Sequence, residues 1–422
     1  MKAEILNKLT ILAESAKYDV SCASSGTTRH GSKGNLGSAS GWGICHSFTE
    51  DGRCVSLLKI MLTNHCIYDC AYCINRRTNE LKRAAFTVEE LVELTIEFYR
   101  RNYIEGLFLS SGVISTPDHT MVMMVQVIKI LRTIHRFNGY IHMKSIPGCS
   151  QQLVHEAGLY ADRLSVNIEI PTEKNLQLLA PEKDHDSVFK PMHFIQQGML
   201  ESAEERKKFS KAPKFVPAGQ STQMIIGATD ETDLQVLKTT SFLYDKPGMK
   251  RVYYSGYIPV NQGDSRLPKI VQAPLVRENR LYQADWLLRF YGFKVDEIVD
   301  DSFPNLDLEM DPKLAWALRH PEQFPVDINK ADYQMILRVP GIGVKSAKLI
   351  ISSRRFCKLS THDLKKMGIV MKKAQYFITC NELMMLNSVQ DYTPEYVRRE
   401  LTSNKFNRKK TDQNQLSLVF DS

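Results

Sequence analysis

The sequence has little cysteine and no long apolar run. It contains 9 Cys in 422 residues. The longest apolar stretch, near residues 121–134, is interrupted by Gln126, Lys129 and Arg132, which excludes a membrane-spanning helix of about 20 apolar residues there. The first residues also lack the apolar core of a signal peptide. We therefore expect a cytoplasmic protein without a membrane partner, in a compartment where clustered cysteines serve as metal or catalytic sites rather than as disulfides.

Positive charge is concentrated at one end of the chain. From Lys330 onward, 17 Lys and Arg stand against 8 Asp and Glu, a net charge of +9, whereas the preceding 329 residues carry 38 against 39, a net charge of −1. A near-neutral body with a basic C-terminal quarter predicts a polyanionic partner. A solvated, lysine-rich surface is the alternative interpretation.

Strand-like and helix-like segments alternate from Cys54 onward. The predicted strands are 55–62, 106–110, 140–145, 163–168, 223–227 and 251–254. The predicted helices between them are 88–101, 120–136, 151–161 and 233–244, the first introduced by a capping box of Thr87 and Glu90. This order predicts a parallel sheet with helical crossovers, either an open doubly wound sheet or a partial barrel. In both folds, ligands bind at the carboxyl ends of the strands.

Three cysteines stand close together in the stretch TNHCIYDCAYC, residues 63–73. Cys66, Cys70 and Cys73 have the spacing C-x3-C-x2-C and follow the first predicted parallel strand. Zinc sites generally combine two cysteine pairs, or a cysteine pair with histidines, and here only His65 is adjacent. Three thiolates suit three irons of a [4Fe–4S] cluster whose fourth iron is open to another ligand. Zinc remains the alternative.

The spacing, with Tyr72 before the last cysteine, resembles the signature of radical S-adenosylmethionine (SAM) enzymes. The resemblance implies an α/β fold, a partial (β/α)6 TIM-like barrel of the radical SAM type. It also implies a [4Fe–4S] cluster on Cys66, Cys70 and Cys73, with SAM as the second cofactor. Such a cluster cleaves SAM reductively to a 5′-deoxyadenosyl radical, and its electron comes from a low-potential donor of the flavodoxin or ferredoxin type.

The resemblance further implies SAM contacts at the strand ends. The loop after the second strand matches the segment that contacts the SAM amino group, although it lacks the acidic residue usual in the family. The fourth strand supplies the ribose contacts, the fifth the adenine platform, and Lys144 the partner of the SAM carboxylate. The alternative for each polar residue is a satisfied side chain on the rim. The expected cofactor contacts are Tyr72, Ser110, Ser111, Gly112, Lys144, Asn167, Glu169, Ile225 and Gly227.

The remaining cysteines form no recognisable motif. Two of them, Cys45 and Cys54, lie just before the first predicted parallel strand, near the same rim. A second cluster or a substrate-facing thiol is one interpretation of this group, and buried inert thiols are the other. The group consists of Cys22, Cys45, Cys54 and Cys149. Cys357 and Cys380 are expected to be structural.

The stretch VDINKADYQMILRVPGIGVKSAKLIISSRR, residues 326–355, predicts two helices joined by a tight hairpin. Asn329 is the expected N-cap of the first helix, and the second begins near Val344. The stretch resembles the helix–hairpin–helix motif of DNA-binding proteins, in which hairpin amides and lysines contact a phosphate without reading sequence. A weaker second copy has Gly368 at its turn. A protein-binding helical hairpin is the alternative. The expected DNA contacts are Gly341, Ile342, Gly343, Lys345 and Lys348.

The C-terminal segment QNQLSLVF resembles the short peptides with which bacterial proteins bind the replication sliding clamp. Docking of this segment on its own domain is the alternative. The expected clamp-binding residues are Gln415, Leu416, Leu418 and Phe420.

The stretches ESAKYDVSCASSG, LTNHCIYDCAYC and RENRLYQADWLLRFYGF together resemble a family of radical SAM proteins associated with DNA modification and repair, and this resemblance covers nearly the whole chain. That resemblance implies DNA as the substrate and a uracil-DNA-glycosylase-like partner. Modification of RNA, and a non-catalytic iron–sulfur or zinc DNA-binding protein, are the alternatives. The expected domains are 1–50, an N-terminal helix and Ser/Gly-rich segment; 51–265, the barrel; 266–325, a connecting helical region; 326–380, the all-α helix–hairpin–helix module; and 381–422, a basic disordered tail.

Overall fold

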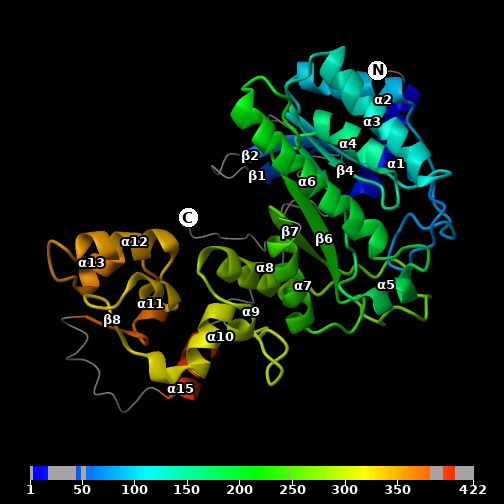
Figure 1. Cartoon of the computed structure of the whole chain (residues 1–422). Helices are drawn as coiled ribbons and strands as arrows, with labels where there is room; N and C mark the ends of the chain where they lie inside the picture. The colour runs from blue at the N-terminus through cyan, green and yellow to red at the C-terminus, as the bar shows by residue number, and fades with distance from the viewer. Residues whose placement is uncertain (1–2, 18–43, 49–53, 247, 381–392, 404–422) are drawn as a thin grey trace, which may run out of the picture. The chain divides into compact units, whose positions relative to one another are not determined.

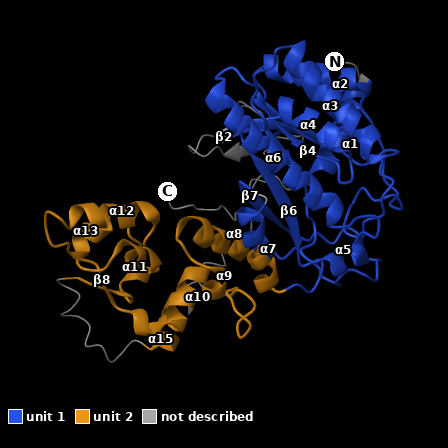
Figure 2. Ribbon diagram, in the orientation of Figure 1, with its two compact units in different colours: residues 1–231, 239–275 blue, residues 232–238, 276–422 orange. Residues whose placement is uncertain are grey.

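The computed structural model describes residues 3–17, 44–48, 54–246, 248–380 and 393–403 (Figure 1). The chain divides into two compact units (Figure 2). Unit 1 comprises residues 1–231 and 239–275, and unit 2 comprises residues 232–238 and 276–422. In the described ranges, no helix is both long enough and apolar enough to span a membrane.

Unit 1 is built on a seven-stranded sheet whose spatial order follows the chain from β1 to β7. The strands are β1 (Ile44–Phe48), β2 (Cys54–Met61), β3 (Gly106–Ser110), β4 (Tyr140–Lys144), β5 (Arg163–Ser165), β6 (Gln220–Ile226) and β7 (Arg251–Gly256). β1 pairs antiparallel with β2, and all later pairs are parallel. Because the order never reverses, the sheet has no doubly wound switch point. The six parallel strands therefore form a half-barrel.

The six predicted parallel strands are confirmed, with shifted ends. β6 starts at Gln220, three residues before the predicted strand, and β5 ends at Ser165, three residues before the predicted end. After Ser165, the chain leaves the regular ladder, and the Ile168 N–H is bonded to the Thr222 hydroxyl instead of to a neighbouring carbonyl. The antiparallel edge strand β1 was not predicted.

Helices connect the strands of unit 1. They are α2 (Val88–Arg100), α3 (Pro117–Thr133), α4 (Gln151–Tyr160), α5 (Glu173–Leu179), α6 (Asp186–Lys208) and α7 (Asp233–Asp245), and α1 (Ala3–Ala16) precedes the first strand. The first residues of α7, up to residue 238, belong to unit 2. Of these helices, α2, α3, α4 and α6 pack successively against one another (Figure 1). The predicted capping box is confirmed, since Thr87 accepts from the Glu90 N–H and Glu90 from the Thr87 N–H. α3 starts earlier than predicted because Thr116 caps it and Pro117 occupies its first turn.

Unit 2 is mainly helical. Its elements are α8 (Leu275–Phe290), α9 (Val295–Ile298), α10 (Pro312–Arg319), the 3-10 helix η1 (Pro321–Gln323), β8 (Val326–Asp327), α11 (Tyr333–Arg338), α12 (Val344–Ser353), α13 (Thr361–Lys366), α14 (Met371–Ala374), β9 (Ile378–Thr379) and α15 (Pro394–Ser403). β8 and β9 form a short parallel pair. The prediction of an all-α module is therefore corrected.

The predicted boundary at residue 325 does not separate two compact units. Trp316 is buried at 1% exposure and packs edge-on against Phe293 and Phe324. The Arg338 guanidinium lies over the rings of Phe293 and Trp316, at 4.3 and 5.2 Å from their centroids. The expected connecting region and the expected helix–hairpin–helix module therefore share one core in unit 2.

Two further predictions for this region are corrected. Asp332, not Asn329, caps α11, because its carboxylate accepts from the Met335 N–H. Asn329 instead bonds both ways with the main chain of Leu359. Residues 394–403, expected within a disordered tail, form α15, where Val397 is buried and Arg398 pairs with Asp307 at 2.9 Å.

Candidate functional site

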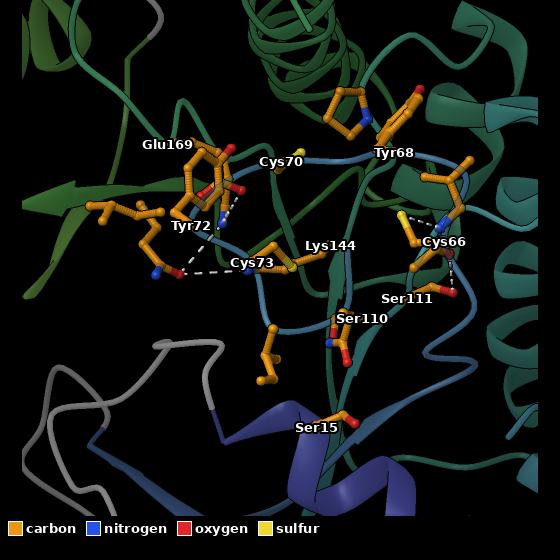
Figure 3. A pocket seen from close by; sticks show the side chains of 18 of the residues that line it. Ser15, Cys66, Tyr68, Cys70, Tyr72, Cys73, Ser110, Ser111, Lys144 and Glu169 are labelled. Carbon is orange, nitrogen blue, oxygen red and sulfur yellow. Dashed lines mark hydrogen bonds between the residues drawn. The ribbon is translucent and has the colours of Figure 1, made fainter. Parts of the chain in front are cut away.

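A pocket lies at the carboxyl ends of the parallel strands of unit 1, where the sequence predicted a ligand site (Figure 3). Gly227 does not line it. That glycine has φ +81°, and an added Cβ would lie 2.9 Å from Pro274, so it serves the turn after β6. The predicted residues that line the pocket are Cys66, Cys70, Tyr72, Cys73, Ser110, Ser111, Gly112, Lys144, Asn167, Glu169 and Ile225.

The cysteine loop, residues 63–79, is held by a dense set of hydrogen bonds. The Cys73 N–H donates to the Cys70 carbonyl at 3.0 Å, and the Ala71 N–H donates to the Leu179 carbonyl at 2.7 Å. From just beyond the loop, the Arg83 guanidinium donates to four of its carbonyls, those of Asn64, Asn75, Arg76 and Asn79. The loop conformation is therefore fixed both by its sequence neighbours, such as Arg83, and by Leu179, a residue far along the chain.

The segment after β3 is joined to the cysteine loop by its main chain. The Gly112 N–H donates to the Thr63 carbonyl, and the Ile67 N–H donates to the Val113 carbonyl, both at 2.8 Å. The Val113 N–H points at the Cys66 sulfur, at 3.5 Å. A Cβ on residue 112 would lie 2.3 Å from the His65 carbonyl oxygen, so only glycine permits this approach.

Cys70 is buried, whereas Cys66 and Cys73 are half-buried. Burial, reinforced by repulsion from the Cys70 thiolate, raises the pKa of Cys73 to about 12. Burial also raises the pKa of Cys70. A metal ligand must be a thiolate, so metal binding here would displace protons.

The arrangement of the thiols suits a polynuclear cluster. Among the residues that the structure describes, no three His, Cys, Asp or Glu side chains converge to hold a single metal ion. A tetrahedral zinc ion holds its sulfurs at about 2.3 Å and therefore draws them close together. In a four-iron cluster each thiolate binds a different iron, so the ligands stand further apart. Cys66, Cys70 and Cys73 all line the same pocket, as three ligands of one cluster must.

Several polar atoms of the pocket have no hydrogen-bond partner among the residues that the structure describes. The hydroxyl oxygens of Tyr72, Ser110 and Tyr257 and the side-chain oxygen of Asn167 are buried and accept or donate no hydrogen bond within those ranges. Buried polar atoms are normally paired, so such atoms around one pocket fit a polar ligand. The pocket thus has the donor and acceptor groups that SAM needs, and the individual contacts stay a prediction.

Glu169 has an unusual backbone. Its φ is +61°, in the left-handed region that side chains other than glycine rarely adopt. Its carboxylate accepts from the Asn167 amide at 3.3 Å and lies 3.9 Å from the Lys183 ammonium. Strained backbone of this kind gathers at functional sites. The geometry therefore places a predicted ribose contact in a conformation that directs its carboxylate to the pocket.

Lys183 is a pocket residue that the sequence did not indicate. It lies between α5 and α6, away from any strand end, and its ammonium is 6.0 Å from the Tyr72 ring centroid. Burial by itself lowers the pKa of Lys183, but the charges of Cys70, Tyr72 and Glu169 together raise it well above its ordinary value. Lys183 is therefore a fixed cation beside the cysteines. A lysine in an inter-helix loop carries no motif that would have singled it out.

The other cysteines give no second cluster that the structure can describe. Cys22 and the side chains of Cys45 and Cys54 lie outside the described residues. Cys149 is buried with its sulfur 3.6 Å from the Ser145 hydroxyl, and it does not line the pocket. Cys380 is buried, as expected of a structural residue, whereas Cys357 is exposed, which corrects its structural assignment.

In unit 2, the predicted phosphate contacts lie at one hairpin. Residues 339–343 connect α11 to α12, with Gly341 at φ +87°. Lys345 and Lys348 are exposed on α12. The predicted clamp-binding residues Gln415, Leu416, Leu418 and Phe420 lie outside the described residues.

A half-barrel with three cysteines after its first parallel strand defines a domain built to hold a thiolate-bound metal cluster at the strand ends. Residues 60–198 match the family model described as the Radical SAM superfamily, and this part of the chain is a radical SAM domain. Its cofactors are accordingly a [4Fe–4S] cluster, with Cys66, Cys70 and Cys73 present to bind it, and SAM.

No curated protein matches the chain. Among solved structures, it is similar to the FeFe-hydrogenase maturase HydG from Carboxydothermus hydrogenoformans, with 19% identity over 54% of this chain and 49% of that one, at a TM-score of 0.40. Methylornithine synthase (PylB) aligns with 14% identity over 55% and 61%, at 0.41. The cobalamin-dependent SAM radical enzyme OxsB aligns with 11% identity over 85% and 64%, at 0.31. The chain thus spans less than two thirds of each of these proteins.

Proposed function

We propose that this chain is a radical SAM enzyme that acts on a base or sugar of DNA. The barrel pocket is the proposed reaction site, and unit 2 is the proposed DNA-binding module. The observation that carries the choice of DNA is the hairpin of residues 339–343, which is followed on α12 by the exposed Lys345 and Lys348. The observation that carries the radical chemistry is the superfamily match together with the three cysteines on the pocket wall.

When bound, the [4Fe–4S] cluster and SAM supply reductive cleavage to a 5′-deoxyadenosyl radical. The chain's own residues hold and orient these cofactors. Cys66, Cys70 and Cys73 would bind the cluster. The oxygens of Ser110 and Asn167, which have no partner in the described part of the chain, are available to a polar ligand. A base within a duplex has to leave the stack before it can reach a pocket at the strand ends.

The hairpin geometry supports a phosphate contact. The Lys313 ammonium, buried at 8% exposure, donates to the Ile342 carbonyl at 2.6 Å. Because the C=O and N–H of one peptide unit point in opposite directions, this bond turns the Gly343 N–H away from Lys313. In the part of the chain that the structure describes, that N–H makes no hydrogen bond. It is therefore available to an anion at the start of α12.

The weaker second copy supports the paired form of the motif. Gly368, at φ +77°, forms the turn before α14, as predicted. The Val370 N–H donates to the Gly341 carbonyl at 3.0 Å, and the Ser346 hydroxyl donates to the Met367 carbonyl at 2.9 Å. The second turn thus holds the first hairpin in place, as expected of a packing partner.

Charge supports a polyanion at the same surface. Lys345 and Lys348 are exposed, and neither has an acidic partner among the described residues. Both lie in the first turns of α12, near the N-terminal end of the helix, where the helix dipole favours an anion. Their segment also belongs to the part of the chain with a net charge of +9.

The binding test compares duplex DNA with structured RNA over a series of salt concentrations, using fluorescence anisotropy. The double variant Lys345→Gln, Lys348→Gln should weaken duplex binding and reduce the salt dependence by about two phosphate contacts. The matched control is Lys211→Gln with Lys214→Gln, which removes two exposed lysines from unit 1. Tighter binding of RNA, or equal effects of the two double variants, would contradict the DNA proposal.

The activity test is anaerobic incubation of the reconstituted protein with SAM, a reductant and duplex or single-stranded DNA. Formation of 5′-deoxyadenosine that depends on Cys70, together with a mass change in a released nucleoside, is the expected result. The low-potential electron donor follows from the need for a reductant. The uracil-DNA-glycosylase-like partner and the sliding clamp stay predictions.

A further inference from the structure

Asn261 is bonded to the cysteine loop although it lies far from it along the chain. It lies in the segment of residues 257–267 that follows β7 and is buried at 7% exposure. Its amide nitrogen donates to the carbonyls of Ala71 at 2.7 Å and Cys73 at 3.0 Å. Its amide oxygen accepts from the Asn79 side chain at 2.8 Å. One buried side chain thus uses both donors and its acceptor on the cysteine loop.

Asp264 adds a second polar link from the same segment. Its carboxylate accepts from the Arg76 guanidinium at 2.6 Å and from Arg266 at 2.6 Å. Arg76 in turn donates to the Asn79 side chain at 3.0 Å. Asn261 and Asp264 therefore hold neighbouring parts of the residues that follow Cys73.

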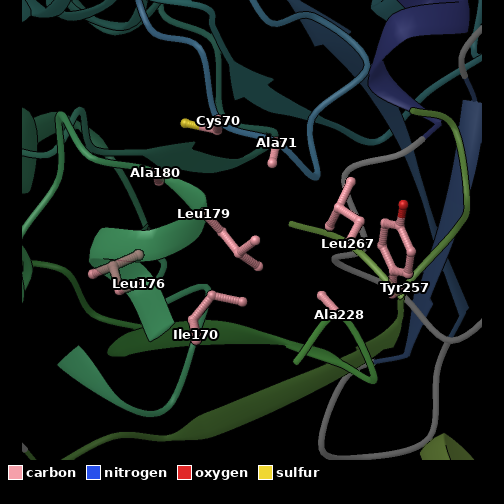
Figure 4. Close-up of a cluster of buried hydrophobic side chains, with 9 residues drawn as sticks. All are labelled: Cys70, Ala71, Ile170, Leu176, Leu179, Ala180, Ala228, Tyr257 and Leu267. Atoms are coloured by element: carbon pink, nitrogen blue, oxygen red, sulfur yellow. The ribbon is translucent and has the colours of Figure 1, made fainter. Parts of the chain in front are cut away.

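Apolar packing joins the same two segments. Tyr257 and Leu267, at the two ends of the segment after β7, belong to one buried cluster with Cys70 and Ala71 (Figure 4). Tyr257, with Ile258 and Val260, also lines the pocket. The segment of residues 257–267 thus both lines the pocket and packs against the cysteine loop.

We propose that Asn261 is a positioning residue for the [4Fe–4S] cluster. By fixing the carbonyls of Ala71 and Cys73, it fixes the backbone on both sides of residue 72 and so the direction in which the Cys73 thiol leaves the loop. Arg83 holds the loop by other carbonyls and does not reach these two. The proposal rests on the cluster assigned to Cys66, Cys70 and Cys73 and not on DNA as substrate, so the two can fail separately.

The test is Asn261→Asp, which keeps the side-chain shape but removes the donors to both carbonyls. After anaerobic reconstitution, three quantities are measured: iron per chain, the electron paramagnetic resonance spectrum of the reduced cluster with and without SAM, and the rate of iron transfer to a chelator. Loss of two hydrogen bonds should make iron transfer about tenfold faster and alter the spectrum. Asn261→Ser and Asp264→Asn are prepared in parallel, so that the conclusion does not depend on the folding of one variant.

The matched control is Gln220→Glu. Gln220 is also a buried amide that donates to a main-chain carbonyl, that of Met192 at 3.0 Å, but it stands at the start of β6, opposite the pocket. This control should keep the wild-type spectrum and iron-transfer rate even where its melting temperature falls. The proposal is overturned if the Asn261 variants retain iron like the wild type, or if Gln220→Glu loses iron as fast as they do.

Discussion

The closest approach between the β3 end and the cysteine loop gives a sharp test of the site. A Cβ at position 112 would lie 2.3 Å from the His65 carbonyl oxygen and 3.3 Å from the Cys66 Cβ. Ordinary contact begins at 3.4 Å, so the Gly112→Ala variant must separate the two segments by 3.4 − 2.3, or about 1.1 Å. The closest neighbour is main chain, and no side-chain rotation can relieve the clash. The substitution should therefore displace Cys66.

The expected cost follows from that displacement. Overpacking of this kind destabilises a fold by about 1–3 kcal/mol. Misplacement of reacting groups by about 1 Å lowers a rate by roughly a hundredfold. The bonds from Gly112 to Thr63 and from Ile67 to Val113, both 2.8 Å, would be stretched by the same movement. We expect Gly112→Ala to fold with reduced iron content and to cleave SAM about a hundredfold more slowly.

The assay is chromatographic measurement of 5′-deoxyadenosine from anaerobically reconstituted protein, with iron per chain and the melting temperature as companions. Gly263→Ala is the control, because an added Cβ there meets nothing within 4 Å. It should leave iron content and rate unchanged. A Gly112→Ala protein with wild-type iron and rate would refute the packing of the two segments described above.

Three further predictions concern Lys313, Arg83 and helix α15. Burial lowers the pKa of Lys313 to about 7, whereas the pKa of a lysine in the unfolded chain is about 10.4. Between these two pH values, Lys313 is protonated in the unfolded state and neutral in the folded state. The free energy of unfolding of unit 2 should therefore rise with pH across that window, and Lys313→Met should abolish this rise in urea unfolding followed by tryptophan fluorescence. Arg83→Lys should lose iron to a chelator faster than the wild type, because one ammonium cannot span four carbonyls; equal rates would contradict this. Arg398→Ala should change the free energy of unfolding by less than about 1 kcal/mol, because the arginine side chain is 48% exposed. Val397→Asp places a carboxylate at a position with 3% exposure, so it should detach α15 and lower the helical circular dichroism.

The parts of the site that follow strand ends could be predicted from the sequence. The alternation of strands and helices places the ends of successive parallel strands on one rim, and this is why Cys66, Ser110, Lys144 and Asn167 line one pocket. The choice between a doubly wound sheet and a partial barrel could not be made in this way. It depends on the order of strand pairing, which alternation does not encode.

Residues that act through loops could not be found from the pattern. Lys183 and Asn261 belong to loops without periodicity, and each acts on the cysteine loop across more than 100 positions of sequence. The further division predicted at residue 325 has a similar origin. Trp316 and Arg338 carry no local sign that they share one core, so the connecting region was read as separate.

The backbone of Glu169 departs from the strand conformation that the local sequence predicts, and this departure contributes to the site. The stretch SVNIEIP predicts a strand through Ile168 with a polar residue at its end, but φ at Glu169 is +61°, which costs a side-chain-bearing residue roughly 1–2 kcal/mol. Two main-chain bonds offset that cost: the Glu169 N–H donates to Gln223 at 3.0 Å, and the Ile225 N–H donates to Glu169 at 2.6 Å. A glycine would adopt this backbone without strain, yet it would leave Lys183 without the carboxylate 3.9 Å away. The strain is thus tied to a charge placed at the pocket, and no helix or strand propensity requires a carboxylate there.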